Sequence, residues 1–365
     1  MRIAVSPAIV YPARARTPPP IRYSITMPTH PLHAVRFESV ACLNPLLDES
    51  LLVVDPQAWF AARPWLTANP RSLARAESLD ARALDALLNT REAFDGVARI
   101  IGLGGGTAID TAKYLAWRTG LPLILVPSAL TVDAPFTDSA AVRRDGRIHY
   151  TGSVAPEAVI VDAALIRTAP AHLNRGGVGD ILSIHTALYD WRLAHARTGE
   201  PYDAAIAQQS ASLLERLRDQ SREIYAVSDA GVRLLTELFC EEVYLCLQAG
   251  SSRPEEGSEH HLLYTLEYLT GRTYLHGAAV TLCALVMAYL QGNAPDALRA
   301  LADACGVEYR AILAEAGADA LVEAVLRAPD YARAEGLPYT VLMATPITRE
   351  RAQAAVVWVA APLPP

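Results

Sequence analysis

The chain has 365 residues, of which 52% are hydrophobic, and a formal net charge of −7. This length accommodates two domains with cores of their own. The mildly acidic composition, without a stripe of arginine or lysine, argues against a nucleic-acid partner. No apolar run reaches the roughly 18 residues that a membrane span needs.

Cysteine usage and the first 30 residues bear on the compartment. The five cysteines lack CxxC spacing, so we expect reduced, mostly buried thiols in a cytoplasmic protein. Residues 1–30 contain six prolines and no periodic pattern. We expect a disordered extension there, with translation starting at Met1 or at Met27. Pro7 and Pro12 interrupt the early apolar stretch, which argues against a secretion signal.

Residues 50–126 alternate strand-type and helix-type patterns. The run SLLVVD at 50–55 predicts a buried parallel strand. A helix follows over 80–88, then the strand and helix of residues 98–114, and then a third strand over 121–126. This alternation predicts a parallel sheet with crossover helices, and ligands bind at the carboxyl ends of such strands.

The most informative segment is ARIIGLGGGTAIDTAKY at residues 98–114. A short apolar strand leads into three glycines, and a helix is expected to begin at Thr107. Glycines let a ligand approach the backbone closely, and the free N–H groups of a helix start suit a diphosphate. The segment does not match GxGxxG, the usual dinucleotide fingerprint. Lys113 is the only lysine in the chain.

Asp55 ends the first strand and has two interpretations. An acid there can accept hydrogen bonds from ribose hydroxyls and repel a 2′-phosphate. It can equally be the N-cap of the next helix. The sequence leaves both open.

A polar loop, a hairpin and a last strand complete the predicted α/β domain at residues 31–170. The loop PSALTVDAPFTD at 127–138 follows the third strand at the ligand edge. Strands over 139–142 and 147–150 flank Arg-Asp-Gly, which indicates a hairpin turn. The final strand is expected over 158–162.

After Pro170 only helical patterns remain, so residues 171–365 are predicted to form an all-helical domain that packs beside the α/β domain and leaves a cleft between the two. GGVGD at 176–180 opens a long helix over 181–196. Further helices are expected over 202–219, 229–249, 258–269, 276–290, 295–316 and 317–327. Asp190 on the long helix is expected to pair with Arg192 or solvent.

Three side chains of this helical half could hold a metal. Asp180 starts a helix, His260 lies near the start of another, and His276 starts a third. One carboxylate and two imidazoles suit a catalytic divalent metal with positions left for substrate. Each residue alone also fits an N-cap or a structural histidine, and the spacing does not decide. No GxSxG or Walker motif points to hydrolase or nucleotide-hydrolysing chemistry.

Several segments together resemble one superfamily. GGGTAIDTAK at 104–113 resembles the GGGxxxDxAK motif of the iron-containing alcohol dehydrogenase and dehydroquinate-synthase-like superfamily. TVDAP at 131–135 is similar to a segment of glycerol dehydrogenases. The glycerol-1-phosphate dehydrogenase branch is resembled by Gly179–Asp180 with residues 186–194, by GSEHH at 257–261, by LHG at 275–277 and by YTVL at 339–342. The resemblance spans residues 35–355.

The resemblance implies a metal-dependent, NAD(P)-linked dehydrogenase that interconverts a small polyol or polyol phosphate, of the glycerol-1-phosphate or glycerol type, and its ketone. Its fold would be a Rossmann-like α/β domain with a parallel sheet, followed by an all-helical domain. We also expect a homo-oligomer. One divalent metal, with zinc favoured and iron or nickel as alternatives, would be held by Asp180, His260 and His276.

The same resemblance assigns the cofactor and substrate contacts. NAD, with NADP as the alternative, would contact Asp55, Gly104, Gly105, Gly106, Thr107, Asp110, Ser128, Thr131, Thr137 and Ser139. Asp133 would reach the substrate hydroxyls. Relatives often have a lysine where this chain has Ile184; if that lysine holds a phosphate, phosphate recognition differs here. Many also have a histidine at Tyr264, so a proton relay would use Tyr264, His261 or water.

Two other functions remain as alternatives. A sugar-phosphate cyclase of the dehydroquinate-synthase type also uses NAD and a metal, but it depends on several lysines and arginines around a phosphate. A chain with one lysine fits this poorly. An inactive relative would have no reason to keep all three metal-ligand candidates.

Overall fold

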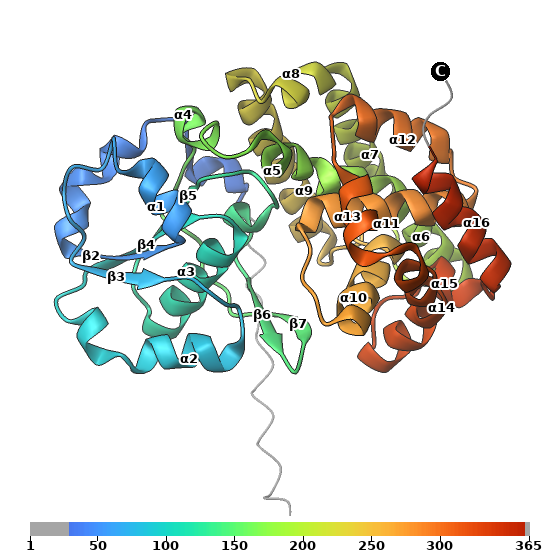
Figure 1. Cartoon of the computed structure of the whole chain (residues 1–365), viewed down its shortest axis with the longest axis horizontal. Coiled ribbons are helices and arrows are strands. Elements are labelled where there is room, and N and C mark those ends of the chain that lie inside the picture. Colours follow the sequence, from blue (N-terminus) through green and yellow to red (C-terminus); the bar gives the residue numbers. More distant parts are fainter. Residues whose placement is uncertain (1–28, 362–365) are drawn as a thin grey trace, which may run out of the picture.

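A six-stranded parallel sheet forms the centre of the N-terminal half in this computed structural model, which describes residues 29–361 (Figure 1). The strand order is β1-β8-β5-β4-β2-β3. The strands are β1 (Val35–Arg36), β2 (Ser50–Val54), β3 (Ser72–Arg75), β4 (Arg99–Gly104), β5 (Leu123–Pro127) and β8 (Ala158–Ile160). Because β3 and β4 lie on opposite sides of β2, the chain order reverses between β2 and β4, and ligands bind at such switch points.

Alternate side chains of the strands enter two separate cores. In β2, Leu51 and Val53 pack into the core that includes α3 and the C-terminal helices. Leu52 and Val54 pack into a smaller core with the 3-10 helix η2 (Val40–Glu49) and α1 (Pro56–Ala62). All five β2 residues are buried, which explains the continuous apolar run at this position.

Most of the other elements in the described residues are helices. The sheet half contains η1 (Pro31–Ala34), α2 (Ala81–Asn89), η3 (Arg91–Phe94), α3 (Gly106–Thr119) and η4 (Ala134–Phe136). After β8 every element is a helix: α4 (Ala163–Ile166), α5 (Ala171–Gly176), α6 (Val178–Thr198), α7 (Ala204–Asp219), α8 (Ser221–Ala226), α9 (Asp229–Ala249), α10 (Ser258–Thr270), α11 (His276–Gln291), α12 (Pro295–Ala304), α13 (Tyr309–Ala316), α14 (Ala318–Glu335), α15 (Val341–Ala344) and α16 (Arg349–Ala360). Figure 1 shows the sheet on the left and helices α6 to α16 gathered on the right.

A two-stranded antiparallel hairpin, β6 (Ala140–Arg144) and β7 (Arg147–Thr151), lies between the two halves. Asp145 and Gly146 at its tip have φ angles of 51° and 77°. This is the left-handed pair that an Asp-Gly hairpin turn requires. Strand β7 packs against α10, so the hairpin reaches from the sheet half to the helical half.

The predicted fold class, a Rossmann-like parallel sheet followed by helices, is confirmed. The expected elements missed the short strands β1 and β3 and the helices α1, α4, α5, α8, α15 and α16, and they merged α12 with α13. Division into domains at residue 170 stays a prediction. The expected extension at residues 1–30 and the choice of Met1 or Met27 fall outside the described residues, except for Thr29 and His30.

Between residues 29 and 361, no helix combines the length and the hydropathy that a bilayer crossing needs. All five cysteines have free thiols. Cys240, Cys283 and Cys305 are buried, as expected for core residues. Cys42 is exposed, so the expectation of a core position is wrong for this residue.

Candidate active site

The glycine turn at the end of β4 lies at the switch point of the sheet. Gly105 caps α3 without a side-chain hydrogen bond, so the first N–H groups of this helix have no side-chain partner at the cap. A Cβ added to Gly105 would meet nothing within 4 Å, which means that open space lies above the turn. Gly104, by contrast, has a φ of 156° and packs against Asp55 and Ala108. This arrangement fits a cofactor diphosphate at the helix start.

Asp55 is the N-cap of α1, as one of its two interpretations predicted. Its Oδ1 accepts a hydrogen bond from the Ala58 backbone N–H at 2.7 Å. Its Oδ2 accepts a longer bond, 3.4 Å, from the N–H of Gly105. Asp55 therefore joins the end of β2 to the glycine turn, and a ribose contact remains a prediction.

The side chain of Lys113 anchors the loop that follows β5 through hydrogen bonds. Its Nζ lies 2.9 Å from Asp110 Oδ1, and the lysine side chain is completely buried. The three N–H donors of Nζ form hydrogen bonds with the Ala134 carbonyl, Thr137 Oγ1 and the Ser139 carbonyl. The sole lysine is thus a structural brace. Asp110 and the Thr137 hydroxyl are engaged in this brace, so their expected cofactor contacts stay predictions.

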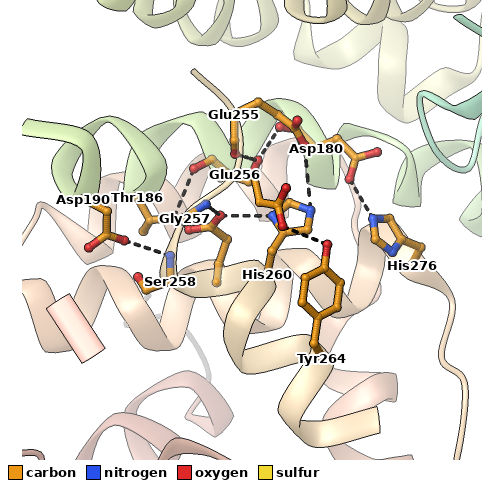
Figure 2. A network of polar contacts seen from close by, with 12 residues as sticks. Asp180, Thr186, Asp190, Glu255, Glu256, Gly257, Ser258, His260, Tyr264 and His276 are labelled. Atoms are coloured by element: carbon orange, nitrogen blue, oxygen red, sulfur yellow. Dashed lines mark hydrogen bonds and ion pairs between the residues drawn. The ribbon is translucent and has the colours of Figure 1, made fainter. Parts of the chain in front are cut away.

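Asp180, His260 and His276 converge on one point, although they come from three helices (Figure 2). Each offers one ligand atom, and these atoms lie within 4.8 Å of one another. Asp180 Oδ1 lies 3.3 Å from His276 Nε2, and the two histidine rings are 5.6 Å apart between centroids. Asp180 Oδ1 is buried and has no hydrogen-bond donor. This orphaned oxygen and two imidazoles form a donor set that fits a divalent metal.

Close backbone contact between α6 and α11 sets the spacing of two of these residues. A Cβ on Gly179 would lie 2.0 Å from the carbonyl oxygen of Gly277, so only glycine fits. Gly179 immediately precedes Asp180, and Gly277 immediately follows His276. The contact between the helices therefore fixes how near Asp180 and His276 come to each other.

Glu259 holds the ring of His260 in place. Its Oε1 lies 3.0 Å from His260 Nδ1 and also accepts a hydrogen bond from the Gly257 N–H. Its Oε2 accepts a hydrogen bond from the Thr186 hydroxyl on α6. With Nδ1–H donating to Glu259, the lone pair of His260 Nε2 faces the metal group.

Further carboxyl groups surround the metal group. The Asp133 N–H donates to Asp180 Oδ2 at 3.4 Å, and burial together with the Asp180 charge raises the pKa of Asp133 to about 7. Glu255 Oε1 lies 3.7 Å from His260 Nε2. Burial, followed by the charges of neighbouring acids, raises the pKa of Glu255 well above its usual value.

Tyr264 and His261 lie on α10 beyond His260 but have different surroundings. The Tyr264 hydroxyl donates to Glu256 Oε1 at 2.9 Å, so this pair can carry a proton. Burial raises the pKa of Tyr264 well above normal, and Glu256 and Tyr150 add to the rise. His261 lies outside the three-residue metal group. Its Nδ1 is buried without a partner, and burial lowers its pKa to about 4.

Residues far apart in the sequence complete the site, and several of them were not expected. They are Tyr150 from β7, Glu242 from α9, Glu255 and Glu256 from the segment before α10, and Glu259 from the first turn of α10. Among these residues, only Glu242 could have been recognised from the sequence, because it is an acidic residue on the apolar face of its helix. Asp190 was expected to meet Arg192 or solvent; instead it is buried, and it accepts hydrogen bonds from the Ser258 and Val341 N–H groups. Ser128 and Thr131 lie in the loop at the end of β5, beside the glycine turn.

Sequence and structural comparisons agree with this geometry. The sequence profile of the iron-containing alcohol dehydrogenases matches residues 68–170. A glycerol-1-phosphate dehydrogenase [NAD(P)+] from Aeropyrum pernix is 34% identical over 266 residues, which cover 72% of this chain and 74% of the relative. One from Methanothermobacter thermautotrophicus is 30% identical over 317 residues, covering 80% and 89%.

A solved structure has the same fold. The crystal structure of a probable glycerol dehydrogenase from Sinorhizobium meliloti superposes with a TM-score of 0.66 at 21% identity, covering 89% of this chain and 95% of the other. The parallel sheet with its glycine turn, the helical half with its metal-ligand group and the two curated relatives lead to one conclusion. The chain belongs to the iron-containing alcohol dehydrogenase superfamily and is an NAD(P)-linked oxidoreductase of CH–OH groups.

Proposed function

We propose that this protein interconverts a small polyol, or a polyol phosphate, and the corresponding ketone, using NAD(P) and one divalent metal. The observation that carries the proposal is the convergence of Asp180, His260 and His276 within 4.8 Å. Asp180 is in turn hydrogen-bonded to the backbone of the loop that follows β5. That loop begins beside the glycine turn, so metal ligands and cofactor cradle belong to one connected site.

Different residues of the site have different roles in the reaction. Asp180, His260 and His276 would hold the metal, which would supply a Lewis acid for the substrate oxygen, and bound NAD(P) would accept the hydride of the carbinol carbon. The oxidised alcohol also gives up its hydroxyl proton. Tyr264 and Glu256 take up this proton through their hydrogen bond, with His261 or water as the alternative relay. Asp133, next to Asp180, accepts a hydrogen bond from a second substrate hydroxyl.

The finer assignments follow from the same residues. Two imidazoles and one carboxylate suit zinc, with iron or nickel as alternatives. Asp55 beside the glycine turn favours NAD over NADP because its charge repels a 2′-phosphate. Free cysteines and a formal net charge of −7 are compatible with a cytoplasmic homo-oligomer that does not bind nucleic acid.

The direct test is turnover by the metal-loaded protein, followed through the near-ultraviolet absorbance of the reduced nicotinamide. We expect NAD(P)-dependent oxidation of at least one small polyol or reduction of its ketone. His276→Ala should abolish turnover, because it removes a metal ligand. His149→Ala, on the exposed face of β7, should leave turnover unchanged.

Two results would contradict the proposal. One is the absence of turnover and of metal and nicotinamide binding across a broad polyol and ketone panel. The other is release of inorganic phosphate from a sugar phosphate without net reduction of the cofactor, which would point to the cyclase alternative.

A further inference from the structure

Helices α6 and α7 pack against each other but leave a hollow, which we call the α6–α7 hollow. It is lined by three residues of α6, five of α7, Tyr202 from the loop before α7 and Asn293 from the segment after α11. Its volume is about 370 Å³, which lies in the range of small-molecule sites. No lining residue belongs to the metal group or to the glycine turn, so the hollow is separate from the proposed catalytic site.

Half of the lining of this hollow is apolar. Leu188 of α6 and Leu214 of α7 are both buried, and the other apolar residues are the α7 alanines Ala204, Ala207 and Ala211. Alanines three and four positions apart lie on one side of a helix. Their short side chains leave the space that the hollow occupies, and a ligand with an apolar body can bury its surface there.

The charge of the lining has one sign. Arg192 supplies a guanidinium group, and no carboxyl group of residues 29–361 forms an ion pair with it. Tyr202 and Gln208 add a hydroxyl and an amide, and none of the lining residues is acidic. The nearby acid Asp203 is the N-cap of α7 and accepts hydrogen bonds from backbone N–H groups of that helix. The hollow therefore offers an unneutralised cation to an anionic ligand.

Two contacts hold the walls of the hollow in place. His185 Nε2 lies 2.6 Å from the carbonyl oxygen of Asn293, and Asn293 Nδ2 donates to the carbonyl oxygen of His185 at 3.0 Å. The ring of Tyr202 packs edge-on against Trp191, with 4.9 Å between centroids. Walls that are already ordered reduce the entropy cost of binding a ligand.

His185 adds no charge to the lining. Burial lowers its pKa, and the charges of Arg218 and Arg192 add to this effect, whereas the hydrogen bond to Asn293 opposes it. The ring is therefore neutral at pH 7. Arg192 is the residue of the lining that attracts an anion.

We propose that the α6–α7 hollow binds a small organic carboxylate with an unbranched apolar chain. Its carboxylate pairs with Arg192, and its chain packs on Leu188, Leu214 and the alanines of α7. The planar guanidinium matches a carboxylate with two parallel hydrogen bonds, and each buried CH₂ group adds to the affinity. An inorganic anion would use only the charge of the hollow, and a neutral alkyl compound only its apolar lining.

Isothermal titration of the metal-loaded full chain with butanoate, hexanoate and octanoate tests this proposal. We expect one octanoate per chain, with an affinity that rises about threefold to fourfold for each added CH₂ group. Octanamide has the same chain without the charge, and it should bind about tenfold more weakly or less. Inorganic phosphate and acetate, which lack the chain, should show no measurable binding.

Substitutions locate the bound octanoate. Arg192→Gln should lower its affinity about tenfold or more and leave polyol turnover unchanged. Arg197→Gln is the matched control, because Arg197 is an exposed arginine of the same helix outside the lining. Ala211→Phe should abolish binding by filling the hollow at constant charge, and thermal unfolding checks that each variant is folded. His276→Ala should keep octanoate binding, since this ligand does not use the metal group.

Four results would overturn the inference. Equal affinity for octanoate and octanamide would exclude pairing with Arg192, and so would equal losses in Arg192→Gln and Arg197→Gln. Loss of binding in His276→Ala would place octanoate at the metal group. Binding of phosphate in preference to octanoate would indicate a site for inorganic anions. Failure of all three carboxylates to bind would remove the proposed ligand class, whereas the dehydrogenase proposal is tested separately by polyol turnover.

Discussion

The hydrogen bond between Glu259 and His260 determines which imidazole nitrogen is available to a metal. Glu259 is completely buried, and it bonds Thr186, Gly257 and His260 at once. Such a partner fixes the tautomer and the orientation of a metal-binding ring. It belongs to the site although it touches no ligand.

We therefore expect Glu259→Gln to weaken metal binding by about 10- to 100-fold, the range found for partners of metal-bound histidines. Competition against a chromophoric zinc chelator measures this directly. Glu237→Gln, a surface substitution on α9, is the control and should leave the affinity unchanged. Unchanged affinity in Glu259→Gln would show that the ring of His260 is held by other contacts.

Asp190 links stability to pH. Burial, and then the nearby Glu259 charge, raises its pKa to about 7 from a value near 4 in an unfolded chain. Between these values the folded protein binds more protons than the unfolded chain, so the free energy of unfolding falls as pH rises. The contribution is fully present below about pH 4 and lost above about pH 7.

We expect the metal-free protein to lose up to about 1.4 kcal/mol of stability per pH unit in this window from one such group. Urea unfolding at a series of pH values measures the slope. Asp190→Asn should make the slope shallower, although buried acids such as Glu242 and Glu255 contribute with the same sign. An identical slope in the variant would mean that Asp190 stays ionised in the folded protein.

At the scale of elements, the crossing of α6 and α11 determines the metal geometry. These helices meet through backbone at Gly179 and Gly277, with no room for a Cβ. The sequence places Asp180 and His276 beside these glycines, so a small separation of the helices moves both ligands.

Gly179→Ala should therefore lower metal affinity by more than tenfold and also destabilise the fold, because overpacking typically costs about 1–3 kcal/mol. Isothermal titration with zinc measures the first effect. Gly292→Ala, at the C-cap of α11 with a φ of 65° and open space around it, loses stability without touching the crossing. If both variants bind zinc equally well, the crossing does not control the site.

At the scale of the whole molecule, a metal would connect elements that are distant along the chain. The three ligand candidates lie in the first turns of α6, α10 and α11. Asp180 also accepts a hydrogen bond from the backbone of the loop that follows β5. Binding only to the folded state stabilises it by RT ln(1 + [L]/Kd), about 2.7 kcal/mol when the free metal is at 100 times Kd.

We expect zinc to raise the thermal unfolding midpoint by several degrees and a chelator to reverse the rise. The triple variant Asp180→Asn, His260→Ala, His276→Ala should lose this response, whereas His149→Ala should keep it. A response that survives in the triple variant would place the metal elsewhere.

Local sequence signals were sufficient to predict many of the strands, turns and helices of this protein. Continuous apolar runs located β2, β4 and β5, since strands buried on both faces cannot alternate with polar residues. The glycine turn and the Asp-Gly hairpin were predictable because few residues adopt these backbone conformations. Helices α6, α9, α10 and α11 followed from their periodicity.

Only the tertiary structure decided the rest. Strands β1 and β3 are too short to carry a pattern, and pairing with β8 and β2 creates them. Spacing could not decide whether Asp180, His260 and His276 meet, because ligands on three helices depend on how those helices pack. For the same reason the sequence did not predict the carboxyl groups around them. The charge of Asp133, for example, raises the pKa of Glu242, although the two residues are more than a hundred positions apart in the chain.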